Sequence, residues 1–138
     1  MMRPTFRLAP VALALSAVVT VGACASTPGN VAAAPAWFDA SADQFEGWAL
    51  IRNGEIHLYG EQRDLDRGIP NDCVSAALPR NLQRASGDLN GMKIRLHGRT
   101  LAWADRSGAQ THDWQGSTLV NDCRRDVVIL ADRVEALR

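Results

Sequence analysis

The chain has 138 residues, 46% of them hydrophobic, with 15 basic and 15 acidic side chains. A chain of this length has room for one domain of ordinary size. Its neutral balance lacks the large positive charge of a general nucleic-acid or anionic-lipid binder.

The first segment has the plan of a secretory signal. Arg3 and Arg7 precede the apolar run LAPVALALSAVVTV, and no acidic residue lies among them. The run is shorter than the roughly 20 apolar residues that span a bilayer. We therefore expect residues 1–23 to be a signal peptide.

Val21-Gly22-Ala23-Cys24 follows directly and resembles the lipobox of bacterial lipoproteins. The resemblance implies cleavage before Cys24 and a diacylglycerol on its sulfur, so that buried acyl chains anchor the protein to a membrane. Such lipoproteins carry Asp after the cysteine when they stay in the inner membrane. Ala25 at this position therefore implies the periplasmic face of the outer membrane. An alternative is an ordinary signal cleaved later, near AAAPA, which leaves a soluble protein with a spare thiol.

Residues 24–36 are rich in Ala, Pro, Gly and Ser, which predicts a flexible tether. Residues 37–138 are then the folded domain. Loss of Arg3 and Arg7 leaves the mature chain mildly acidic, so no nucleic-acid partner is expected.

Two cysteines remain once Cys24 carries lipid. In an oxidising periplasm, Cys73 and Cys123 are expected to form a disulfide. The alternative is a metal site in which the cysteines recruit His57, His97 or His112. No close spacing of cysteines and histidines supports that alternative, so we expect neither a metal nor another cofactor.

Asn53-Gly54 lies between two apolar stretches and predicts a β-hairpin with a two-residue turn. The turn sets the pairing of the two strands, from Arg52 with Glu55 at the turn to Trp48 with Tyr59. One face, expected to lie in the core, holds Ala49, Ile51, Ile56 and Leu58. The opposite face is amphipathic and holds Trp48, Leu50, His57 and Tyr59.

The remaining strands and helices are predicted from the periodicity of apolar residues and from the positions of proline and glycine. We expect a short strand from Cys73 to the residue before Pro79, and a short helix within residues 80–91. Residues 92–103 alternate between apolar and polar side chains, which predicts a half-buried strand. A last strand is expected to reach Ala131, and residues 41–44 have the form of a helix capping box, which predicts one helical turn.

Together these elements predict a mainly β domain: a small five-stranded β-barrel with one short helix and one disulfide. LNGMKIRLHGRTL resembles the G-x-x-V-x-V-x-G strand of OB-fold modules, and VVILADRVEAL resembles their closing strand. The resemblance covers roughly Phe45 to Leu137 and implies an OB-like barrel. The chain is also similar to small proteobacterial lipoproteins of uncharacterised activity. OB-folds share architecture without sharing chemistry, so the resemblance implies no functional residues.

Two surfaces are candidate binding faces. The basic stripe on the strand at residues 92–103 can line a groove for phosphate, carboxylate or a polyanionic glycan. The simpler interpretation is a solvated strand face, which a bulge at Gly98 interrupts. The amphipathic hairpin face can stack a sugar ring or nucleobase, or it packs against a loop or helix. The candidate residues are Lys93, Arg95, His97, Arg99, Trp48, His57 and Tyr59.

The sequence contains no Gly-x-Ser-x-Gly elbow, His-Glu-x-x-His motif or phosphate loop. A disulfide would also remove the thiols of Cys73 and Cys123 as nucleophiles. We therefore expect a non-enzymatic, lipid-anchored protein whose barrel binds a periplasmic partner, either a protein or an envelope glycan. The alternatives are a small-ligand or metal-binding module and a protein that only supports envelope integrity.

Overall fold

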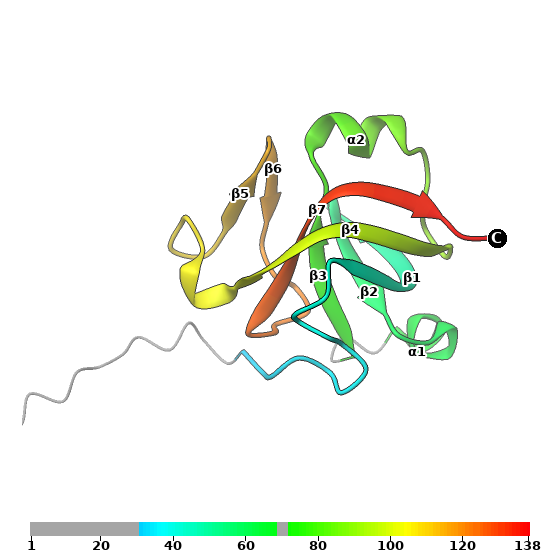
Figure 1. Cartoon of the computed structure of the whole chain (residues 1–138), viewed down its shortest axis with the longest axis horizontal. Coiled ribbons are helices and arrows are strands. Elements are labelled where there is room, and N and C mark those ends of the chain that lie inside the picture. The colour runs from blue at the N-terminus through cyan, green and yellow to red at the C-terminus, as the bar shows by residue number, and fades with distance from the viewer. Residues whose placement is uncertain (1–30, 69–71) are drawn as a thin grey trace, which may run out of the picture.

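The computed structural model describes residues 31–68 and 72–138 (Figure 1). The expected signal peptide, the Cys24 lipidation site and the first part of the expected tether lie outside these residues. Within the described ranges, no helix is both long enough and apolar enough to cross a membrane.

Five strands form a closed barrel in the order β1-β2-β3-β7-β4, and β4 pairs with β1 to close it. They are β1 (Gln44–Arg52), β2 (Glu55–Tyr59), β3 (Cys73–Ala77), β4 (Lys93–Ala102) and β7 (Val127–Ala136). β3 and β7 are parallel, and the other neighbours are antiparallel. This topology is OB-like and confirms the predicted fold class.

Two short helices and a small hairpin complete the described structure. α1 (Gln62–Arg67) follows β2, and α2 (Arg80–Ala85) connects β3 to β4. A 3-10 turn η1 (Trp103–Asp105) and the strands β5 (His112–Trp114) and β6 (Ser117–Leu119) lie between β4 and β7. Figure 1 shows the β5–β6 hairpin to one side of the barrel and α2 at one end. α2 was predicted, whereas α1, which buries none of its residues, was not.

The first hairpin has the predicted register. Trp48 pairs with Tyr59, and Arg52 pairs with Glu55. Asn53 and Gly54 have φ of 51° and 78°, the left-handed conformation that a type I′ turn requires. Apolar residues from every barrel strand fill the interior, among them Ala49, Ile56, Leu58, Val74, Ile94, Leu96 and Ile129.

A register shift lies between His97 and Gly98, where β4 pairs with β7. His97 pairs with Arg133 and Gly98 with Ala131, so the extra residue of the bulge is in β7. A Cβ atom at Gly98 would lie 2.1 Å from the Leu130 carbonyl oxygen, so only glycine allows this approach. β7 continues to Ala136, beyond the predicted end at Ala131, because its second half pairs with the first half of β4.

Two segments before β1 differ from expectation. Residues 41–44 form no helical turn, and the Asp39 side chain instead accepts hydrogen bonds from the backbone N–H and hydroxyl of Ser41. Ala32, in the expected tether, pairs with Arg125 and exchanges backbone hydrogen bonds with its two neighbours, Arg124 and Asp126. Contact with the barrel therefore begins before the boundary expected at residue 37.

Candidate functional site

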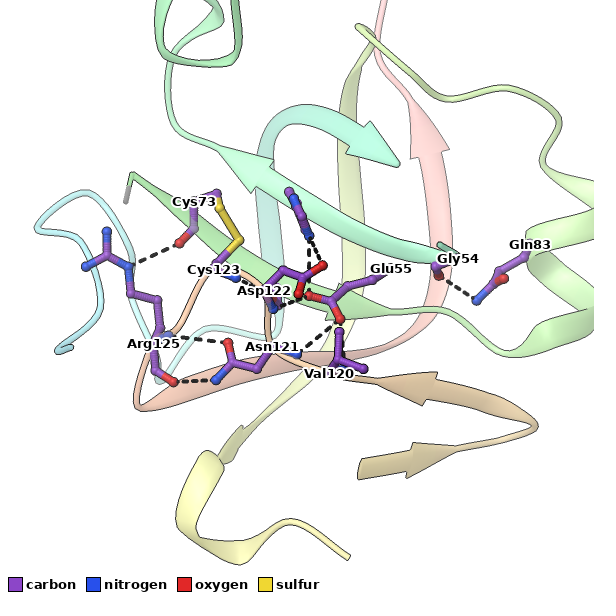
Figure 2. A network of polar contacts seen from close by, with 11 residues as sticks. Gly54, Glu55, Cys73, Gln83, Val120, Asn121, Asp122, Cys123 and Arg125 are labelled. Atoms are coloured by element: carbon purple, nitrogen blue, oxygen red, sulfur yellow. Dashed lines mark hydrogen bonds and ion pairs between the residues drawn. A yellow bond between two sulfur atoms is a disulfide. The ribbon is translucent and has the colours of Figure 1, made fainter. Parts of the chain in front are cut away.

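The outer face of β2 and β3 is covered by residues 120–126, which we call the covering loop (Figure 2). This loop joins β6 to β7. Alternation along the paired strands places His57, Tyr59, Cys73 and Ser75 on the outer side of the barrel. All four side chains are nevertheless buried, with Tyr59 only 2% exposed. The predicted hairpin face thus packs against a loop, as one of the two interpretations expected.

Glu55 connects β2 to the covering loop. Its Oε2 accepts hydrogen bonds from the backbone N–H groups of Val120 (2.8 Å) and Asn121 (3.1 Å). Its Oε1 accepts one from the N–H of Asp122 at 2.9 Å. The side chain is only 1% exposed, so three successive amides of the loop are satisfied by one buried carboxylate.

Burial raises the pKa of Glu55, but the adjacent His57 imidazole, the Ser75 hydroxyl and the N–H groups of Val120 and Asp122 outweigh it. The net effect is a pKa below the ordinary value of 4.5. The carboxylate is therefore ionised at neutral pH and makes charge-assisted hydrogen bonds.

The disulfide expected from the cysteine count is present. Cys73 on β3 and Cys123 in the covering loop are bonded, with their Cα atoms 5.5 Å apart. The N–H of Cys123 donates to the Ser75 hydroxyl at 3.1 Å. Arg125 donates from Nε to the Cys73 carbonyl and from Nη1 to the Ala33 carbonyl, and so holds the segment before β1 against the same loop.

A hollow of about 360 Å³ opens beside the disulfide, and its lining residues are Arg52, His57, Tyr59, Gly68, Cys73 and Asp122. It lies where the covering loop meets the β1–β2 hairpin. His57 and Tyr59 were predicted as candidate binding residues, whereas Arg52 and Asp122 were not. Burial raises the pKa of Tyr59, so the phenol that lines this hollow is uncharged at neutral pH.

Trp48 connects the two predicted groups of candidate residues. It pairs with Tyr59 on β2 and with Lys93 on β4, so the three side chains form a row across the outer side of the barrel. Trp48 is partly buried against the cluster of Tyr59, Cys73 and Cys123. Lys93 is exposed at the other end of the row.

The basic stripe on β4 is largely paired with acidic side chains. Arg95 forms ion pairs with Glu46 on β1 and Glu135 on β7, and His97 Nε2 lies 2.8 Å from Glu135 Oε2. The contact with His97 is the main cause of a lowered pKa at Glu135. We call this open surface of β1, β4 and β7 the charged face; its residues are Glu46, Lys93, Arg95, His97, Arg133 and Glu135. Arg99 is not part of the charged face, because its guanidinium carbon lies over the Trp114 ring, 5.4 Å from the ring centroid.

Comparison with models of protein families, with curated proteins and with solved structures gave no match to the chain.

Two groups of side chains in the described ranges have the composition and spacing of metal ligands. One is His57 with Cys73 and Cys123, and the other is Glu55 with His57 and Asp122. The sulfurs of the first group are joined in the disulfide. Sequence reasoning considered the first group and missed the second, because Glu55 and Asp122 meet only when the covering loop folds over β2.

Proposed function

We propose that the protein is a non-enzymatic lipoprotein, anchored through Cys24 to the periplasmic face of the outer membrane, whose barrel binds a periplasmic protein. The lipobox-like Val21-Gly22-Ala23-Cys24 supports the anchor. The disulfide supports an oxidising compartment. It also leaves neither Cys73 nor Cys123 as a thiol nucleophile, which agrees with a non-enzymatic role.

One observation carries the choice of binding surface: the two sides of the barrel differ in what covers them. OB-folds bind oligonucleotides and oligosaccharides on the face of their second and third strands. Here the covering loop, linked by Glu55 and by the disulfide, occupies that face. The charged face on β1, β4 and β7 stays open to solvent, with Glu46, Lys93 and Glu135 exposed.

The charges of the open face favour a protein over a polyanionic glycan. Arg95 lies between two carboxylates, Glu46 and Glu135, so the face is not uniformly basic. Charges of both signs in a fixed arrangement select a partner with a complementary pattern.

A sugar-binding platform has less support. Stacking of a sugar ring needs an accessible aromatic face. Tyr59 is almost fully buried, and Trp48 is partly covered by the same cluster. Arg99 covers part of the ring of Trp114.

The test is site-specific photo-crosslinking in living cells that express the full chain. A photo-reactive residue at position 44, exposed on β1 directly opposite His97, reports on the charged face, and the same residue at position 84, exposed on α2, is the matched control. We expect a discrete crosslinked protein from position 44 and none from position 84. Lys93→Glu should weaken that crosslink, whereas Arg84→Glu, the same charge change on α2, should leave it unchanged.

Equal crosslinking from positions 44 and 84, or a product that Lys93→Glu does not weaken, would contradict a partner at the charged face. Detergent sensitivity on deletion of the gene, without any crosslinked partner, would favour the structural envelope role instead.

A further inference from the structure

The imidazole of His57 is buried without a hydrogen bond at one ring nitrogen. His57 is 6% exposed, and among the described residues its Nε2 has no hydrogen-bond partner. A buried polar atom left unpaired destabilises the folded state, and most such atoms in folded proteins are paired. An unpaired Nε2 in a buried position therefore indicates a ligand that would bind to it.

Two carboxylates face the same nitrogen. Nε2 lies 3.4 Å from Glu55 Oε1 and 3.7 Å from Asp122 Oδ2, and all three ligand atoms lie within 4.8 Å of one another. Figure 2 shows the side chains of Glu55 and Asp122 converging from β2 and from the covering loop. Ligand atoms about 2.1 Å from a tetrahedral zinc ion lie about 3.4 Å apart. The three atoms thus have the spacing of ligands around one ion.

The Glu55 carboxylate is held in place and still has capacity to bind an ion. Oε2 of Glu55 is occupied by the Val120 and Asn121 amides, while Oε1 accepts one hydrogen bond, from Asp122. A carboxylate oxygen has a second lone pair for an ion. The three amides therefore orient the Glu55 carboxylate, as outer-shell partners orient metal ligands elsewhere.

The surroundings allow an ion to enter and to keep an open coordination position. The Asp122 side chain is 47% exposed, and both Asp122 and His57 line the hollow of about 360 Å³. Three protein ligands with water in a fourth position is a common arrangement for an accessible zinc ion. Two carboxylates also balance the charge of a divalent cation, whereas Arg52, across the hollow, remains positive.

We infer that Glu55, His57 and Asp122 form a binding site for a divalent transition-metal ion of the zinc class. The imidazole selects zinc, copper or nickel over magnesium and calcium, which prefer ligand sets made only of oxygen. The site is separate from the charged face. It also lies under the covering loop, so a bound ion would link β2 to this loop in addition to the disulfide.

The test uses the full chain purified in detergent, without a histidine tag and without reductant. Zinc is titrated in competition with a chromophoric chelator, and bound metal per chain is measured by elemental analysis. We expect one equivalent of zinc. Asp122→Asn should weaken binding by at least about tenfold, the effect of losing even an outer-shell partner. The substitution is nearly isosteric at a half-exposed site, so the fold should be retained.

His97→Asn is the matched control, because His97 also contacts a carboxylate, that of Glu135, but on the charged face. It should leave zinc affinity unchanged, whereas His57→Gln should abolish binding and any zinc-dependent rise in melting temperature. Absence of binding, or equal affinity in wild type and Asp122→Asn, would overturn the assignment. So would binding that appears only after reduction, because it would place the ion on His57, Cys73 and Cys123.

Discussion

The backbone N–H of Asn121 lies 3.1 Å from Oε2 of Glu55, although 66 residues separate the two in sequence. Asn121 has a φ of 59°, a left-handed conformation that asparagine tolerates better than most residues. Its side chain bonds the backbone N–H and carbonyl of Arg125. The covering loop is thus held from below by a buried carboxylate and from within by one amide side chain.

Replacement of that carboxylate should destabilise the fold strongly. We expect Glu55→Ala to lower the free energy of unfolding by about 3 kcal/mol, because three amides lose a charged acceptor in a buried place. Urea unfolding of the full chain, followed by tryptophan fluorescence, measures the change. Glu135→Ala, which removes an exposed carboxylate, is the control and should leave the urea midpoint nearly unchanged. Equal midpoints for the two variants would show that Glu55 does not hold the loop.

The same carboxylate gives a defined dependence of stability on pH. The pKa of Glu55 is lowered in the folded protein from the ordinary value of 4.5, so its ionised form stabilises the fold above that pH. This contribution is lost as the pH falls below 4.5 through the folded pKa. With a chelator present, the difference in urea midpoint between wild type and Glu55→Gln should shrink as the pH is lowered below 4.5. A difference that grows over this range would contradict the assigned direction.

The disulfide should contribute much of the stability. Cys73 and Cys123 are 50 residues apart, and loop-closure entropy predicts a stabilisation of roughly 4 kcal/mol. The double variant Cys73→Ala, Cys123→Ala should therefore melt well below wild type in thermal unfolding followed by circular dichroism. Reduction of the wild-type disulfide is the control for the substitutions themselves and should lower the melting temperature to a similar extent. A double variant as stable as the oxidised wild type would mean that the covering loop is held without the bridge.

Gly98 should tolerate no side chain. Its Cβ position lies 2.1 Å from the Leu130 carbonyl oxygen, and a backbone atom cannot yield as a flexible side chain does. We expect Gly98→Ala to cost about 3 kcal/mol or to prevent folding. Gly87→Ala is the matched control, because no atom other than those of its chain neighbours lies within 4 Å of the Cβ position there. Only its positive φ of 68° opposes alanine, at about 1 kcal/mol. Similar losses for the two variants would show that the bulge relaxes.

Local patterns predicted the barrel well, because its strands are specified by short-range signals. Asn53-Gly54 set the hairpin register residue by residue, and alternation located β4. α1 carried no such signal, since Leu65 is the one large apolar residue among its six. The sequence predicted a strand as far as Ala131 and left the following residues unassigned, because only pairing with β4 holds residues 133–136 in a strand.

Only the part of the candidate site that lies on one hairpin was predicted, because the rest depends on contacts between distant parts of the sequence. Alternation placed His57 and Tyr59 on the outer side of β2 correctly, but it cannot indicate what covers that side. Glu55 was predicted only as the residue that pairs with Arg52 at the turn. Its burial depends on amides 65 to 67 residues away, and no local pattern encodes a contact of that range.

The most direct test of the lipid-anchored, disulfide-linked architecture is the intact mass of the full-length gene product purified from bacterial membranes. The mass is measured with and without a thiol-blocking reagent added after denaturation. We predict a chain that begins at Cys24, carries a diacylglycerol increment and gains no blocked thiol. A chain without lipid would contradict the anchor, and two blocked thiols would contradict the bridge that holds the covering loop over β2 and β3.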